Sequence, residues 1–424
     1  MNYDKYFTDT VKHIKPSGIR KFFDAASIYK DVVSLGVGEP DFDTPWTTRE
    51  AAIRSIRSGF THYTANSGLI KLREEIARYM SVRFDLKYDP KDEIFVTVGA
   101  SEPIYLMLRT FVGEGDEVVV PDPSYVSYAP GVELCGGKAV SAKCRAEDSF
   151  ALTPSALEEA ITPRTKVLIL PYPNNPTGAI MTGPQLKAIA DIVKKHDLFV
   201  LSDEIYAELT YGGKHVSIAT LEGMRERTVV INGFSKAFAM TGWRLGFVCA
   251  PREVEKQMLK IHQYIIMCAP TSAQYAGLQM LKSAFEDNFS AVEEMREEYN
   301  VRRRFLVDRL NKMGLTCFEP RGAFYVFPCV RSTGMDGEQF AERLIESKKS
   351  RRRPRRCVRG ERQRLCPHKL RLLAVRPQKG DGQDRRICQR IKAKQITLSR
   401  KAVLAQKDGF SGIEKIFQKF AKNS

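Results

Sequence analysis

The chain has 424 residues, 43% of them hydrophobic, and a formal net charge of +17. This length predicts a large and a small domain rather than one ordinary domain, and no stretch approaches the run of about 20 apolar residues that spans a bilayer. The polar start of the chain carries no signal-peptide core, and the nine cysteines form no CxxC pair. This pattern favours free thiols in the reducing cytoplasm over a disulfide framework or a metal site.

The basic charge is concentrated in one late segment. Residues 348–401 contain 21 lysine and arginine residues against three acidic residues, whereas the part before residue 348 is slightly acidic. A tail that binds nucleic acid or an anionic surface is one explanation of such a block. The block lacks interleaved aromatic residues and any known nucleic-acid motif. We therefore do not expect nucleic acid as a partner, and the block needs another explanation.

Strand-like and helix-like segments alternate along most of the chain. The apolar, strand-like runs are Glu93–Val98, Glu117–Val120, Lys166–Leu170, Leu198–Ser202, Thr228–Ile231 and Gly246–Cys249. Amphipathic helical stretches include Leu69–Phe84, Pro103–Phe111 and Pro184–His196. This alternation predicts an α/β fold, with a mostly parallel sheet covered by helices on both faces. In open sheets of this kind, ligands bind at the carboxyl ends of the strands.

Small and aromatic residues follow the first two strands. Ala100 and Ser101 come where a helix is expected to begin, and the backbone N–H groups of such a turn can hold a phosphate. Tyr125 follows the second strand in the run Pro121–Tyr125, where a flat aromatic ring could stack on a flat ligand. Both patterns also occur in ordinary helix caps and protein cores.

Lys236 is the principal candidate for chemistry. It lies among small residues in the run Asn232–Gly246, with Arg244 eight positions further on. Lysine is the side chain that forms Schiff bases with carbonyl cofactors, and arginine holds phosphate in a two-pronged fork. The run resembles the pyridoxal-phosphate lysine region of the class I/II aminotransferases, which are pyridoxal-phosphate enzymes of fold type I.

The resemblance implies a role for each residue that would hold pyridoxal 5'-phosphate. Asp203, in Ser202–Tyr206, would pair with the pyridine nitrogen, and a carboxylate there keeps the ring protonated. Tyr206 and Asn175 would hydrogen-bond the phenolic oxygen, and Tyr125 would stack on the ring. Asn175 belongs to the run Pro173–Gly178, in which the Asn175–Pro176 bond is a candidate cis peptide. The implied phosphate ligands are Ala100, Ser101, Ser235 and Arg244.

Two further segments match the family. Ser34–Phe42 resembles its substrate strip, which places Gly38 at the carboxylate of the amino acid, with Tyr125 and Asn175 also facing the substrate. Thr61–Thr64 resembles the segment whose tyrosine reaches a phosphate across a dimer interface. Tyr63 is therefore expected to serve the site of the neighbouring subunit in a homodimer.

The implied function is movement of an amino group between an L-amino acid and a 2-oxo acid through a Schiff base at Lys236. A carbon–sulfur β-lyase would use the same lysine, and an inactive relic that only binds the cofactor is a third alternative. No metal is expected. The expected organisation is a segment 1–45 that forms the N-terminus and part of the small domain, a large cofactor-binding domain 46–280 and the rest of the small domain over 281–349. The small domain would contain a helix pair over 281–316 and a strand over Gly322–Phe327.

The resemblance is continuous from about Val32 to about Ser347 and then stops. The family continues with a strand like VAVVPG and with GFVRISYA, whose arginine grips the substrate carboxylate. Synonymous codons can be chosen for Leu365–Arg371 such that the same nucleotides, read in a shifted frame, encode GFVRISY. The same shift turns the neighbouring residues into a sequence like the missing strand and loop. We therefore interpret residues 350–424 as an out-of-frame translation that forms no regular packed structure and impairs activity.

Overall fold

A seven-stranded sheet forms the centre of the part of the chain described by the computed structural model, residues 1–14 and 38–346. Its strand order is β1-β7-β6-β5-β4-β2-β3, and β7 is antiparallel to both of its neighbours while the other pairs are parallel. The strands are β1 Ile94–Val98, β2 Glu117–Asp122, β3 Lys138–Lys143, β4 Thr165–Leu170, β5 Phe199–Asp203, β6 Thr228–Gly233 and β7 Leu245–Cys249. The predicted α/β fold with a mostly parallel sheet is confirmed.

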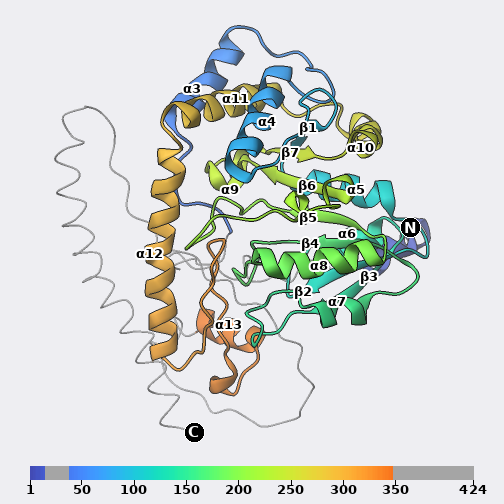
Figure 1. Cartoon of the computed structure of the whole chain (residues 1–424), viewed down its shortest axis with the longest axis vertical. Coiled ribbons are helices and arrows are strands. Elements are labelled where there is room, and N and C mark those ends of the chain that lie inside the picture. Colours follow the sequence, from blue (N-terminus) through green and yellow to red (C-terminus); the bar gives the residue numbers. More distant parts are fainter. Residues whose placement is uncertain (15–37, 347–424) are drawn as a thin grey trace, which may run out of the picture.

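Helices surround this sheet (Figure 1). They are α1 Asp9–His13, α3 Trp46–Arg57, α4 Ile70–Phe84, α5 Ser101–Phe111, α6 Tyr128–Leu134, α7 Pro154–Ala160, α8 Gly183–Lys195, α9 Phe234–Ala237, α10 Arg252–Ile265, α11 Thr271–Glu286, α12 Ser290–Lys312 and α13 Gly337–Glu346. The three helices predicted from amphipathic patterns correspond to α4, α5 and α8, with ends that differ by no more than two residues.

Successive residues of each strand point to opposite faces of the sheet, and both faces are buried under helices. Phe95 packs in a cluster with side chains of α5, α6 and α10, whereas its neighbour Val96 packs with side chains of α4 and α11. Further along the sheet, Val119 and Leu168 pack against α7 and α8 on the face that Val96 occupies. Helices on both faces leave the two ends of the strands as the places where a ligand can reach the sheet.

Helix α8 illustrates how the sequence sets one of these covering elements. Thr182 and Gln185 form a capping box at its start, and a proline stands in the first turn, where its missing N–H costs no hydrogen bond. Leu186, Ile189 and Val193 recur at helical spacing, and all three are buried against the sheet. The other face of this helix carries charged residues.

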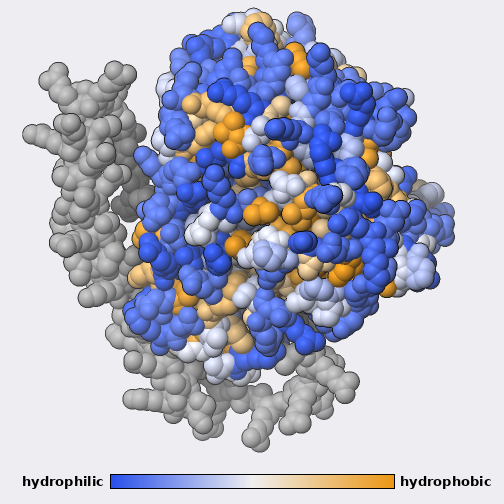
Figure 2. All heavy atoms as spheres, in the orientation of Figure 1, coloured by the Kyte–Doolittle hydropathy of each residue, from blue (hydrophilic) through white to orange (hydrophobic). Residues whose placement is uncertain are grey.

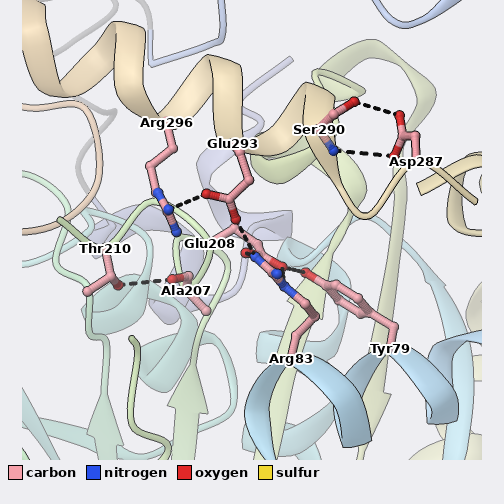
Figure 3. Close-up of polar contacts among 9 residues, drawn as sticks. All are labelled: Tyr79, Arg83, Ala207, Glu208, Thr210, Asp287, Ser290, Glu293 and Arg296. Carbon is pink, nitrogen blue, oxygen red and sulfur yellow. Dashed lines mark hydrogen bonds and ion pairs between the residues drawn. The ribbon is translucent and has the colours of Figure 1, made fainter. Parts of the chain in front are cut away.

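Helix α12 is joined to α4 and to the segment after β5 by a partly buried ion-pair network (Figure 3). Arg83 on α4 donates to both carboxylate oxygens of Glu208 and, at 2.9 Å, to Glu293 on α12. Tyr79 donates a further 3.0 Å hydrogen bond to Glu208, and Arg296 pairs with Glu293. Glu208 lies in the turn after β5, so the network joins α4, α12 and the segment that follows the strand.

Two parts of the predicted organisation differ from the structure. The helix pair expected over 281–316 is the end of α11 followed by the single long helix α12, which Figure 1 shows alongside the rest of the molecule. The strand expected over Gly322–Phe327 is wrong, because Gly322 makes only an isolated bridge with Thr210. Ala323 adopts a φ of 54°, a left-handed conformation that interrupts an extended strand.

Within residues 1–14 and 38–346, no helix is both long and apolar enough to cross a membrane. In the same described ranges, no cluster of three or more His, Cys, Asp or Glu side chains is arranged to hold a metal ion. The basic segment over 350–424 lies outside the described residues.

Candidate active site

The sheet topology brings the predicted residues to one edge. Val98, which ends β1, pairs with Leu245, and Gly233, which ends β6, pairs with Gly246. Because β7 is antiparallel to both neighbours, its first residues lie beside the last residues of β1 and β6. The turn after β1, the segment that carries Lys236 and the residue before β7, Arg244, therefore meet at this edge.

Glycine positions show how closely these segments approach. A Cβ atom on Gly99 would lie 2.5 Å from Nη2 of Arg244, so the guanidinium rests against the turn after β1. A Cβ atom on Gly246 would lie 2.6 Å from the carbonyl carbon of Gly99 and 2.8 Å from the nitrogen of Ala100. Ser101 then begins α5, whose positive end faces this turn. An arginine beside a helix N-terminus is an arrangement that can hold an anion.

Lys236 lies at the same edge, in the short helix α9. Its Nζ atom donates a hydrogen bond to the carbonyl oxygen of Gly38, so the predicted substrate strip and the predicted lysine are in contact. The same ammonium lies 5.7 Å from the ring centre of Tyr206 and 5.6 Å from that of Phe324. Ser235, beside Lys236, is buried.

Asp203 ends β5 and is buried beneath the site. Its Oδ2 atom accepts a 2.7 Å hydrogen bond from the hydroxyl of Tyr128, and its Oδ1 atom accepts from the backbone N–H of Ile205 at 3.3 Å. Burial raises the pKa of Asp203 to about 6, against the lowering effects of the two hydrogen bonds and of the Lys236 charge. A carboxylate in this position is poised to accept a cationic partner.

Two further predicted residues have polar atoms in defined environments. The hydroxyl of Tyr206 is 2.7 Å from the hydroxyl of Tyr325. Asn175 has a buried Oδ1 atom that lacks a hydrogen-bond partner, and such an atom calls for an explanation, such as a ligand. The Asn175–Pro176 bond is cis, which confirms the conformation considered from the sequence.

The aromatic candidates occupy different environments. Tyr125 follows β2 and is partly buried, with its ring centre 5.6 Å from that of Tyr128 in an edge-on arrangement. Tyr63 is 79% exposed, so within one chain it lies on the surface.

Sequence reasoning missed several residues that the structure places at the site. Tyr128 donates a hydrogen bond to Asp203, and the hydroxyl of Tyr325 pairs with that of Tyr206, although each tyrosine is far from its partner in the sequence. Gly99 was passed over, although it stands in the turn next to Ala100 and its φ of 69° suits glycine. The turn pattern could have indicated the glycine, whereas no local pattern indicates the tyrosines.

This arrangement can be compared with known proteins. A family model described as aminotransferase class I and II matches residues 30–390. The chain belongs to this family. The match runs beyond residue 347, where the sequence resemblance was expected to stop.

Individual relatives of this aminotransferase agree with the family assignment. The chain is 53% identical over 344 residues to the aminotransferase-family protein YugH of Bacillus subtilis, covering 81% of this chain and 88% of that one. It is 46% identical over 343 residues to aromatic-amino-acid aminotransferase 2 of Thermococcus litoralis, with 81% and 88% covered. The aspartate aminotransferase structure from Thermus thermophilus with maleate superposes with a TM-score of 0.77 at 38% identity, covering 80% of this chain and 89% of that one.

These similarities confirm the predicted family, fold type I and the aminotransferase assignment. They do not favour the β-lyase alternative, since these relatives carry names or titles that describe them as aminotransferases or place them in that family.

Proposed function

We propose that this aminotransferase uses pyridoxal 5'-phosphate, held at the edge of the sheet, to move an amino group between an L-amino acid and a 2-oxo acid. The observation that carries the proposal is the hydrogen bond from Lys236 to Gly38, made beside the ring of Tyr206 and near enough to the buried Asp203 for the Lys236 charge to lower its pKa. A lysine amine, a buried carboxylate and an anion-binding turn are the three groups that an aldehyde, a pyridine nitrogen and a phosphate require.

The described residues fit this cofactor at three points. Arg244 rests on Gly99 at the start of α5, which suits a phosphate, together with Ala100, Ser101 and Ser235. Asn175 has a buried Oδ1 atom without a hydrogen-bond partner. A 180° rotation of its side-chain amide would exchange the positions of this acceptor and of the Nδ2 donor. That amide can therefore hydrogen-bond the phenolic oxygen, while Tyr125 covers the ring.

Pyridoxal phosphate, when bound, supplies an aldehyde and an electron sink for the electrons released when the substrate loses its α-proton. Lys236 would hold the cofactor and then carry the proton between the substrate's Cα and the cofactor as general base and acid. Asp203 would keep the pyridine nitrogen protonated, because an opposite charge favours the cationic form. Tyr206 would donate to the phenolic oxygen.

Gly38 supports the assignment of the substrate strip. Its carbonyl accepts from Lys236, so a substrate that lies along the strip brings its Cα to the lysine. Tyr125 and Asn175 would line the same space. The relatives are named for aromatic amino acids, for aspartate and for N-acetyl-LL-diaminopimelate, and the first two of these substrate classes are the ones to assay first.

A homodimer is part of the proposal. Tyr63 and Tyr264 are 79% and 85% exposed, and a 3.2 Å hydrogen bond from Asn66 to Gln263 joins the segments that carry them. Phe60, close to Tyr63 in the sequence, stacks on Tyr275. The face in Figure 2 is mostly hydrophilic, with smaller apolar areas between the polar residues. Burial of the exposed aromatic rings against a second copy would bring Tyr63 to the partner's phosphate.

The organisation and location follow as further parts of the proposal. We retain the division into a segment 1–45 that forms the N-terminus and part of the small domain, a large domain 46–280 and a small domain 281–349, with α12 as the first helix that lies wholly within 281–349. The cysteines within the described residues are free thiols, which supports a cytoplasmic location.

The function is tested by following amino transfer and β-elimination in parallel. Purified protein with pyridoxal phosphate should convert an aromatic amino acid or aspartate only when a 2-oxo acid is present. Release of pyruvate and a thiol from a cysteine conjugate, without dependence on a 2-oxo acid, would instead assign the β-lyase. Cofactor binding without either reaction would assign the inactive relic.

The dimer is tested by mixing inactive variants. Tyr63→Ala and Lys236→Ala proteins should each be nearly inactive, and refolding them together should restore about a quarter of the activity, since half of the dimers then contain one intact site. No recovery on mixing would mean that Tyr63 does not serve the partner's site.

A further inference from the structure

The segment that carries Tyr325 bridges two loops of the site. The backbone N–H groups of Arg321 and Gly322 donate to the carbonyl oxygen of Gly178, at 3.0 and 2.9 Å. One residue later, the N–H of Ala323 donates to the carbonyl of Leu209 at 2.8 Å. The first contact is with the loop that contains Asn175, and the second is with the turn that contains Tyr206.

Glycines make this bridge tight. A Cβ atom on Gly322 would lie 2.5 Å from the Cβ atom of Pro173 and 2.7 Å from Ile180, so the segment passes directly over the loop. Gly178 adopts a φ of 75°, which suits glycine, and its Cβ would lie 3.0 Å from the carbonyl oxygen of Tyr325. The backbone leading to Tyr325 is thus fixed relative to both loops.

The side chain of Tyr325 reaches the site itself. It is buried, and its hydroxyl lies 2.7 Å from that of Tyr206. The same hydroxyl abuts Gly38, where any Cβ atom would collide with it. Tyr325 therefore contacts the tyrosine assigned to the cofactor's phenolic oxygen and the glycine that accepts from Lys236.

We propose that Tyr325 is a positioning residue for amino transfer, whose hydroxyl donates to Tyr206 and so directs the Tyr206 proton to the cofactor's phenolic oxygen. The inference rests on the proposed function, because it assumes that Tyr206 faces that oxygen. Each hydroxyl has one proton, and a Tyr206 that donated to Tyr325 would have none for the cofactor. Accepting from Tyr325 also strengthens Tyr206 as a donor, since hydrogen bonds in a chain polarise one another.

The effect can be read from the absorbance of bound pyridoxal phosphate as a function of pH. A proton donated to the phenolic oxygen makes that oxygen a poorer acceptor for the proton taken up at low pH, so it lowers the midpoint of the transition. Tyr206→Phe should therefore raise the midpoint by about one pH unit. Tyr325→Phe should raise it by about half a unit.

The double variant gives the decisive comparison. If Tyr325 acts through Tyr206, Tyr325→Phe should cause no further shift in the Tyr206→Phe background. The matched control is Tyr211→Phe, which removes another buried hydroxyl of the same cluster, one that donates to the carbonyl of Ala323. This control should lower thermal stability without moving the midpoint. An unchanged midpoint in Tyr325→Phe, or additive shifts in the double variant, would overturn the proposal.

A second measurement separates this inference from the proposed function. In protein freed of cofactor, the losses in melting temperature caused by Tyr325→Phe and Tyr206→Phe should be less than additive, because the two variants remove one shared hydrogen bond. Additive losses would overturn the inference whatever the cofactor. A different outcome is that wild-type protein shows no pyridoxal absorbance while the losses are still non-additive. That result would contradict the proposed function. It would also reject the positioning role, because the hydroxyl pair would then be a structural contact only.

Discussion

The hydroxyl of Tyr128 donates a 2.7 Å hydrogen bond to the Oδ2 atom of Asp203, and both side chains are buried. Burial raises the pKa of Asp203 to about 6, and this hydrogen bond works in the opposite direction. Burial also raises the pKa of Tyr128 well above its ordinary value, so the phenol remains a donor at neutral pH. The pair keeps a deeply buried carboxyl ionisable near neutrality.

Replacing Tyr128 should shift the pH dependence of cofactor binding. A protonated Asp203 cannot neutralise a pyridinium, so affinity for pyridoxal phosphate should fall as the pH drops through about 6. Tyr128→Phe removes a donor to the carboxylate and should move this midpoint upward by about one pH unit. Binding titrations between pH 5 and 9 measure it, with Tyr105→Phe on the surface of α5 as the control. A midpoint that stays in place or moves down would argue against the pair.

Asp203→Asn should separate catalysis from stability. Turnover should fall by at least about 100-fold, because a preorganised charge opposite the ring nitrogen is lost. The raised pKa of Asp203 means that its contribution to stability is present below pH 3.8 and is lost as the pH rises through about 6. The variant without cofactor should therefore unfold at the same or a higher urea concentration than wild type at pH 8. Turnover close to wild type would exclude the assigned role.

Gly246→Ala should damage the anion site specifically. The new Cβ would lie 2.6 and 2.8 Å from backbone atoms of Gly99 and Ala100, which cannot move as a side chain can. We expect a loss of about 1–3 kcal/mol in unfolding free energy and weaker binding of pyridoxal phosphate, while binding of unphosphorylated pyridoxal changes less. Gly183→Ala, where a Cβ meets no neighbour, is the matched control. Equal losses for the two ligands would show that the turn does not hold the phosphate.

The network in Figure 3 should contribute to stability more than surface pairs do. Arg83→Met removes the cation that pairs with the buried carboxylate of Glu208, so that only Tyr79 of this network still contacts it. The variant should lose about 2–3 kcal/mol of unfolding free energy. Lys312→Met breaks an exposed pair with Asp308 on α12 and should cost less than about 0.5 kcal/mol. Urea denaturation compares the two. Similar costs would mean that the network behaves as a surface feature.

Local patterns in the sequence were sufficient for most of the sheet and for the residues next to its strand ends. The six apolar runs all form strands of the sheet, because strands that are buried on both faces read as near-continuous apolar runs. The missed strand β3, Lys138–Lys143, is an edge strand with exposed and half-buried residues, so its sequence lacks such a run. Gly322–Phe327 has a strand-like composition, but the left-handed Ala323 interrupts it.

The remaining parts of the site depend on contacts between distant segments. Tyr128 is 75 residues from Asp203, and Tyr325 is 119 residues from Tyr206, so only the folded chain pairs them. The frameshift hypothesis for residues 350–424 falls outside the described residues and stays a prediction. The nucleotide sequence around codon 349 tests it directly.

The most direct test of the account is covalent trapping of the cofactor. Protein incubated with pyridoxal phosphate and reduced with borohydride should carry the pyridoxyl group on the peptide that contains Lys236, as mapped by mass spectrometry. Lys236→Ala should lose the label, whereas Lys260→Ala, a surface variant on α10, should retain it. Equal labelling of the Lys236→Ala protein would contradict the central claim.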